Sequence, residues 1–154
     1  VKLIKRPELP LESFTSDNLF KLYLFDSGIL ASLLNLAPKV IYENNYGMTK
    51  GYYAENIVLQ NLLSGTNSKF YCWTENQAEI EFVCTANDES VIPIEVKSSH
   101  RTRARSLESY INRYKPKLAV KFSQNRIHWD QERAVLNLPL YTAEALEDAI
   151  AALS

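Results

Sequence analysis

The sequence is poor in cysteine, glycine and proline and has no long apolar run, so it lacks the features of disulfide-rich, disordered, repetitive and membrane-spanning proteins. Its two cysteines, Cys72 and Cys84, are isolated, lack the spacing of metal ligands and are expected to be buried and reduced. Four glycines and six prolines are too few for a disordered or repetitive chain. No apolar run approaches the roughly 18 residues of a membrane helix, and the start has no signal-peptide pattern. We therefore expect a cytoplasmic setting with no membrane partner.

The residues that are present are sufficient for one folded domain. The chain has 154 residues, of which 46% are hydrophobic, and it includes nine Tyr, six Phe and two Trp. This length and composition predict a single domain with an ordinary hydrophobic core. The opening VKLIKRPELP has no Met and contains two prolines, Pro7 and Pro10. We expect residues 1–17 to be a linker or arm from a preceding domain, and residues 18–154 to form the domain itself.

Charge is nearly balanced overall but not along the chain. The net charge is −1, whereas the segment 97–126 has nine basic residues and one acidic residue. Such a basic segment could attract phosphate groups, and Arg101, Arg103 and Arg105 are the candidates for contacting nucleic acid. The alternative is a solvated helix and loop, because runs of charge are weak evidence for a partner.

Hydrophobic periodicity predicts alternating helices and strands. Helices are expected at residues 50–63, ending at Ser64 and Gly65, and at residues 105–114, broken before Pro116. Three strands, at residues 71–74, 79–85 and 91–97, are predicted between these helices. The other expected elements are a strand or buried extended segment at 20–25, a helix capped by Asp26 or Ser27, a polar loop at 39–48, strands at 118–122 and 134–140, a loop at 125–132, and a closing helix capped by Thr142.

The second and third strands of this meander carry the main chemical signal. A symmetric hairpin centred on Asp88 pairs Glu81 with Glu95 and Glu79 with Lys97. Like charges that face each other across two strands are destabilising, and a divalent cation between them would remove the penalty. Lys97 could then orient a water beside the metal. The alternative is a charge ladder, with Glu79 against Lys97 and Glu95 solvated, in which none of these residues has a catalytic role.

A further acid belongs to the preceding helix. Glu55 lies early in the helix expected at residues 50–63, on the flank of its apolar stripe. Alone, it would be an acid favoured by the helix dipole in the first turn. Together with Glu81, Glu95 and Lys97, it completes a candidate site that combines three carboxylates and one ammonium group.

The order of these elements and residues resembles the restriction-endonuclease-like PD-(D/E)xK superfamily. Four segments of the chain extend this resemblance: FKLYLFDSGIL, KGYYAENIVLQNLL, AEIEFV with IPIEVKSS, and YKPKLAVKFS with VLNLPLY. They are similar to the domain of unknown function that follows an AAA-type ATPase and a winged helix in predicted prokaryotic ATPases. The resemblance implies an α/β fold with a restriction-endonuclease-like core, in which helices flank a mixed sheet built in the order α-β-β-β-α-β.

The resemblance also implies a site and a reaction. Glu81 matches the first acid of the superfamily, Glu95 and Lys97 match the (D/E)-x-K tripeptide, and Glu55 matches the acid of the helix. Glu81 and Glu95 would hold Mg²⁺ or Mn²⁺, and Lys97 would activate the water that hydrolyses a phosphodiester bond. An ATPase module on the same parent chain is the implied partner.

Three interpretations stay open at this point. The first is a metal-dependent nuclease domain. The second is a catalytically degenerate module that binds nucleic acid or protein, favoured because this chain has Glu81 where the family commonly has Asp. The third is an assembly role in which the aromatic N-terminal arm forms a homo-oligomer.

Overall fold

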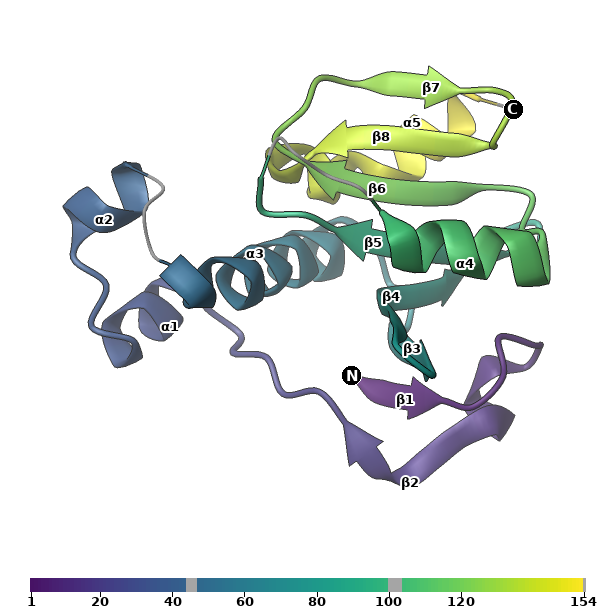
Figure 1. Ribbon diagram of the computed structural model, residues 1–154, viewed down its shortest axis with the longest axis horizontal. Helices are drawn as coiled ribbons and strands as arrows, with labels where there is room; N and C mark the ends of the chain where they lie inside the picture. Colours follow the sequence, from purple (N-terminus) through teal and green to yellow (C-terminus); the bar gives the residue numbers. More distant parts are fainter. Residues whose placement is uncertain (44–46, 100–103, 154) are drawn as a thin grey trace.

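The computed structural model describes residues 1–43, 47–99 and 104–153. A mixed eight-stranded sheet forms its centre, in the order β2-β1-β3-β4-β5-β6-β8-β7 (Figure 1). The strands are β1 (Lys2–Ile4), β2 (Thr15–Phe20), β3 (Tyr71–Glu75), β4 (Ala78–Thr85), β5 (Val91–Val96), β6 (Ala119–Ser123), β7 (His128–Asp130) and β8 (Val135–Pro139).

Helices cover both faces of the sheet. They are α1 (Ser27–Leu33), α2 (Pro38–Tyr42), α3 (Lys50–Gly65), α4 (Arg105–Tyr114) and α5 (Leu146–Ala151), with short 3-10 helices at Leu11–Phe14, Gly47–Thr49 and Leu140–Ala145. One core cluster joins α3 and α5 to the sheet, and a second joins α4 to the opposite face. Figure 1 shows α4 in front of the sheet and α5 behind it. Within the described residues, none of the helices has the length and apolar character needed to cross a bilayer.

The predicted succession through the middle of the chain is confirmed. The structure has α3, β3, β4, β5, α4 and β6 in that order, in an α/β fold with a mixed sheet flanked by helices. Helix α3 buries Ala54, Val58 and Leu62, which belong to the predicted apolar stripe. Helix α1 begins as predicted, since the side chain of Asp26 accepts a hydrogen bond from the backbone N–H of Ile29 at 2.8 Å.

The N-terminal segment contributes to the sheet. Strand β1 pairs in parallel with β3 and antiparallel with β2, and Ile4 is completely buried. Leu11 is buried as well, so apolar side chains anchor this segment to the face that α4 covers. The expected boundary at residue 17 falls inside β2. A preceding domain on the parent chain stays a prediction.

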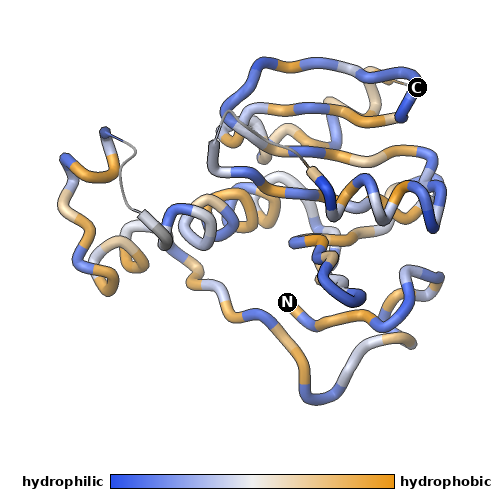
Figure 2. The backbone as a smooth tube through the Cα atoms, in the orientation of Figure 1, coloured by the Kyte–Doolittle hydropathy of each residue, from blue (hydrophilic) through white to orange (hydrophobic). Residues whose placement is uncertain are grey.

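The strand or buried extended segment expected at residues 20–25 is wrong. Strand β2 ends at Phe20, and the following residues run in irregular conformation toward α1. Figure 2 shows this segment as alternating apolar and polar residues outside the sheet. Phe25 is 83% exposed and Leu22 is 73% exposed, so their hydrophobicity does not reflect burial. Leu22 lies between Lys21 and Tyr23, whose side chains turn toward Glu55.

Three further expectations need correction. The polar loop expected at 39–48 contains most of α2, which begins at Pro38; residues 44–46 lie outside the described part. The loop expected at 125–132 contains the short strand β7, which pairs with β8. Thr142 does not cap the closing helix, because its hydroxyl donates to the carbonyl of Pro139 inside a 3-10 helix. Each of these elements is too short for hydrophobic periodicity to identify it.

The predicted register of β4 against β5 is confirmed. Phe82 pairs with Ile94 and Cys84 pairs with Ile92, which sets Glu81 opposite Glu95 when the same register is extended by one residue. On its other side, the pairing of β4 with β3 shifts by one residue between Ile80 and Val83. A shift of this kind is a β-bulge, and it can change the direction of a side chain within a strand. Glu81 lies in this irregular stretch.

Two glycines of α3 allow a matched test of the packing between α3 and the C-terminal 3-10 helix. A Cβ atom at Gly65 would overlap the backbone carbonyl of Glu144, whereas one at Gly51 would meet nothing within 4 Å. We predict that Gly65→Ala lowers the free energy of unfolding by about 1–3 kcal/mol. Gly51→Ala should leave it unchanged or raise it by up to about 1 kcal/mol. Urea denaturation of both variants measures these changes, and equal stabilities would contradict the prediction.

Candidate functional site

The structure brings the predicted acids and the predicted lysine into one region. Glu55 lies on α3, Glu81 on β4, Glu95 on β5, and Lys97 directly follows β5. The negative charges of Glu81, Glu95 and Glu55 all act on the ammonium group of Lys97 and raise its pKa. Helix and strands therefore converge as the sequence predicted.

Glu95 is the most buried of these acids, with 1% of its surface exposed. Its Oε2 accepts a hydrogen bond of 3.0 Å from the backbone N–H of Leu107, in the first turn of α4. Helix α4 has no cap from its own N-terminal residue Ala104, so Glu95 supplies this acceptor from the sheet. The other oxygen, Oε1, forms an ion pair with the ammonium group of Lys97.

Glu81 is also buried and lies beside Glu95. Its Oε2 accepts a hydrogen bond of 2.9 Å from the backbone N–H of Val96. Burial is the main cause that raises the pKa of Glu81 to about 7; the charges of Glu95 and Glu55 add to this shift, whereas Lys97 and the hydrogen bond from Val96 oppose it. The solvated charge ladder is therefore wrong for Glu81 and Glu95, because both carboxylates are withdrawn from water.

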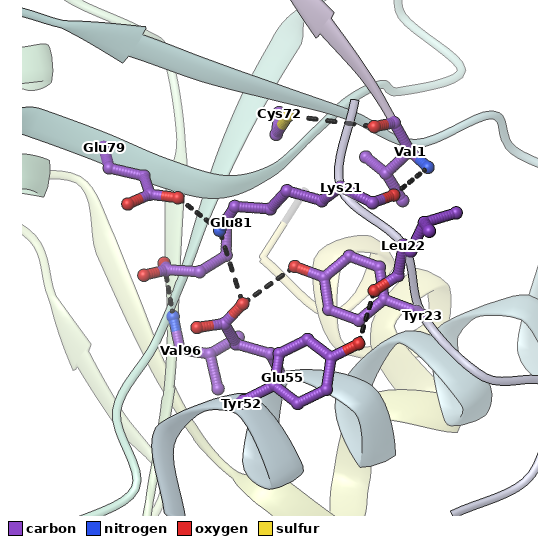
Figure 3. Close-up of polar contacts among 10 residues, drawn as sticks. All are labelled: Val1, Lys21, Leu22, Tyr23, Tyr52, Glu55, Cys72, Glu79, Glu81 and Val96. Carbon is purple, nitrogen blue, oxygen red and sulfur yellow. Dashed lines mark hydrogen bonds and ion pairs between the residues drawn. The ribbon is translucent and has the colours of Figure 1, made fainter. Parts of the chain in front are cut away.

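A second lysine, which the sequence analysis did not select, lies among the acids. The ammonium group of Lys21 forms ion pairs with Glu79 and, at 3.4 Å, with Oε2 of Glu55 (Figure 3). The predicted contact between Glu79 and Lys97 is wrong, since Lys97 pairs with Glu95 instead. Burial lowers the pKa of Lys21, but the hydrogen bond to Glu79 and the neighbouring carboxylates outweigh it and raise the pKa. Lys21 is therefore a permanent cation beside the site.

Several contacts fix Lys21 in this position. The Tyr23 hydroxyl donates to Oε2 of Glu55 at 2.7 Å, and the ring of Tyr23 stacks on that of Tyr52 (Figure 3). Burial and the charge of Glu55 raise the pKa of Tyr23, so the hydroxyl keeps its proton. Asn56, completely buried on α3, bonds to both the N–H and the carbonyl of Leu24. The alternation of Lys21 and Tyr23 with apolar residues was the available sequence signal.

Lys97 is a charged hydrogen-bond donor in this environment. Burial lowers its pKa, but the bond to Glu95 and the charges of Glu81, Glu95 and Glu55 outweigh burial, and the net pKa is raised. Its side chain is 30% exposed, so the ammonium group can still reach solvent or a ligand. A lysine that holds its proton can orient a water or stabilise a phosphate, but it cannot accept a proton.

The acids offer a metal ion two ligands rather than three. Among the described residues, no three His, Cys, Asp or Glu side chains lie close enough to hold a metal together. Oε2 of Glu55 is taken by Lys21 and Tyr23. Glu81 and Glu95 are the remaining pair, each fixed through one oxygen by a backbone N–H. Mg²⁺ in proteins is commonly held by one or two carboxylates, and water and phosphate oxygens complete its octahedron.

The predicted nucleic-acid contacts are only partly within the structure. Arg105 is the first residue of α4 and is exposed. Arg101 and Arg103 lie outside the described residues. Because the backbone N–H of Leu107 bonds to Glu95, the exposed start of α4 is anchored beside the acids.

One comparison with known proteins gives a match. The family model described as Domain of unknown function (DUF4143) matches residues 50–141, which is more than half of the chain. These residues include Glu55, Glu81, Glu95 and Lys97, but not Lys21 or Tyr23. No curated protein and no solved structure matches the sequence.

The raised pKa of Glu81 predicts how stability depends on pH in metal-free buffer. Between about pH 4.5 and pH 7 the native protein keeps this proton and the unfolded chain loses it, so the free energy of unfolding falls as pH rises. Glu81→Gln keeps an acceptor for Val96 without the charge. This variant should lose that part of the pH dependence and, above about pH 7, be more stable by up to about 3 kcal/mol.

Urea denaturation across this pH range measures the effect. Glu132→Gln is the matched control, because Glu132 is exposed in the turn between β7 and β8, strands that β6 separates from β5. The control should reproduce the wild-type pH profile. If Glu81→Gln also reproduced it, burial of the Glu81 carboxylate would not control its protonation.

Proposed function

The chain belongs to the family described as a domain of unknown function, DUF4143, and from its own geometry we propose that it is a nuclease-like domain of the PD-(D/E)xK type. Its proposed reaction is Mg²⁺- or Mn²⁺-assisted hydrolysis of phosphodiester bonds in nucleic acid. The observation that carries this proposal is that the buried carboxylates of Glu81 and Glu95 lie on the paired strands β4 and β5 and act on each other's charge, with Lys97 paired to Glu95.

The donor set fits one hard divalent cation. Oε1 of Glu95 is buried and faces the ammonium group of Lys97, so a cation bound there would share this oxygen with Lys97 or displace the ion pair. Glu81 and Glu95 would hold the ion together with water and phosphate oxygens. When bound, such an ion lowers the pKa of a coordinated water and offsets the negative charge that develops on a phosphate.

The other residues supply positioning and electrostatics. Lys97 keeps its proton, so its proposed part is to orient the attacking water and to stabilise the pentavalent phosphate by donating hydrogen bonds. The proposed part of Glu55 is positioning: its carboxylate binds the ammonium group of Lys21 and the hydroxyl of Tyr23 and so fixes both side chains beside the acids. Arg105, together with Arg101 and Arg103, would bind backbone phosphates, which gives affinity without sequence preference.

The likeness to predicted ATPases adds a partner to this proposal. In that arrangement the domain follows an AAA-type ATPase module on the same parent chain. The ATPase would move or remodel nucleic acid, and this domain would cut or hold it. The support is the resemblance of the four sequence segments described above.

A second function is favoured by one specific observation. Lys21 places a fixed positive charge between Glu55 and Glu79, where it neutralises carboxylates without any metal. Since Lys97 does the same for Glu95, the charges of this cluster are compensated within the protein. A catalytically degenerate module, which binds nucleic acid or protein and performs no hydrolysis, would have this property.

Metal binding tests the first proposal. Glu95→Gln keeps an acceptor for Leu107 but removes one ligand charge, so we expect Mg²⁺ affinity to fall about 10- to 100-fold or more by calorimetry. Nicking of a supercoiled plasmid should be lost in the same variant and in Lys97→Met. Glu132→Gln, at an exposed position, should retain both properties. Absence of Mg²⁺ and Mn²⁺ binding in the wild type would contradict the nuclease proposal.

Lys21→Met separates the two functions. If the acids bind a metal, removal of the competing ammonium group should tighten Mg²⁺ binding, because Glu55 and Glu79 then attract the cation. If the cluster is degenerate, the variant should be less stable and still bind no metal. Calorimetry with Mg²⁺ and urea denaturation of the same preparation distinguish these outcomes, and Lys39→Met is a control at an exposed lysine.

A further inference from the structure

A concave site lies at the opposite ends of the strands that carry the acids. It is a pocket of about 400 Å³ between α5, the β4–β5 turn and the start of β6. On β4 it reaches Cys84 and Thr85, whereas Glu81 lies three residues earlier. On β5 it reaches Ile92, near the beginning of the strand that carries Glu95 close to its end. The pocket, which we name the α5 pocket, is therefore separate from the acid cluster.

The interior of the α5 pocket is apolar. Its lining includes apolar side chains of the core, or packed against it, from six different elements or loops: Phe70, Cys84, Ile92, Leu118, Trp129 and Leu146. A volume of this size suits a small organic molecule, and apolar walls with a few polar groups at the mouth are typical of such sites. The half-buried ring of Trp129 offers a flat surface on one wall.

The charges at its mouth are predominantly negative. The charged residues that line the pocket are Asp88, Glu147 and Lys117. Lys117 forms an ion pair with Asp88 at 3.2 Å, so these two charges compensate each other. Glu147 accepts a hydrogen bond from the neutral hydroxyl of Thr66, which leaves its charge in place. That charge reaches the interior, because it adds to the effect of burial in raising the pKa of the Cys84 thiol.

We propose that the α5 pocket binds a small molecule with a flat apolar body and a cationic end. The apolar body would lie against Trp129 and the core side chains, and the cation would lie at Glu147. An anionic ligand would meet the uncompensated carboxylate, and a larger polar ligand would leave the apolar walls uncovered. The thiol of Cys84 stays protonated, so binding is noncovalent.

Three matched probes test this proposal by calorimetry: naphthylmethylammonium, naphthylmethanol and naphthoate. They share one ring system and differ in charge. We expect the cation to bind tightest, about three- to tenfold more tightly than the anion, since the carboxylate at the mouth is solvated. Glu147→Gln should abolish this preference while the neutral probe still binds.

Filling the pocket supplies a second test. Ile150→Trp adds volume at a lining position and should abolish binding of all three probes. Ile127→Trp adds the same side chain at a position that is 65% exposed and outside the pocket, so binding should be retained. Urea denaturation shows whether each variant is folded.

The location of the bound probe can be read from the two tryptophans. Trp129 lines the pocket, whereas Trp73 is completely buried in the cluster under α4 on the other face. Binding should shift the indole N–H resonance of Trp129 and leave that of Trp73 unchanged. The proposal is overturned if no probe shifts Trp129, if the three probes bind equally, or if the anion binds tightest.

Discussion

The pairing of β4 with β5 is the constraint on which the site depends. Side chains in a strand alternate between two faces, so a slip of one residue would send Glu81 and Glu95 to opposite sides of the sheet. The apolar residues Phe82, Ile92 and Ile94 prevent such a slip, because it would remove them from the core that they form with α3. Hydrophobic burial thereby holds two carboxylates together that would otherwise repel each other.

The sheet separates two environments of different chemistry. In the acid cluster, the carboxylates of Glu81 and Glu95 are buried, whereas Glu55, Glu79, Lys21 and Lys97 are partly exposed. Ion pairs within the chain compensate most of these charges. At the opposite strand ends, the walls are apolar and charge is confined to the mouth. The strands between them are rigid because Phe82, Ile94 and Phe122 are completely buried. A ligand at the acid cluster would therefore be recognised through charge, and a ligand at the α5 pocket mainly through apolar contact.

The sequence allowed the local features of this arrangement to be predicted, but not the distant ones. A symmetric turn at Asp88 and alternating apolar residues were enough to predict the register of β4 and β5, and hence that Glu81 and Glu95 lie on paired strands, but not that Lys97 contacts Glu95 rather than Glu79. Lys21 was missed because its contact with Glu55 spans 34 residues and depends on an irregular segment that obeys no periodicity. The parallel pairing of β1 with β3 is similarly distant in sequence. Both contacts depend on tertiary packing, which single-sequence patterns do not encode.

Glu95 serves the acid cluster and the beginning of α4 with the same carboxylate. One of its oxygens pairs with Lys97 and the other accepts from the backbone N–H of Leu107. The two interactions share one carboxylate charge, so a change in one alters the strength of the other. Coupling of this kind is reciprocal. If a cation bound to Glu95, it would compete with the backbone N–H of Leu107 for the carboxylate, and a partner that stabilised the start of α4 would in turn change the affinity of Glu95 for that cation. The stability of the start of α4 and the affinity of Glu95 for a cation would therefore change together.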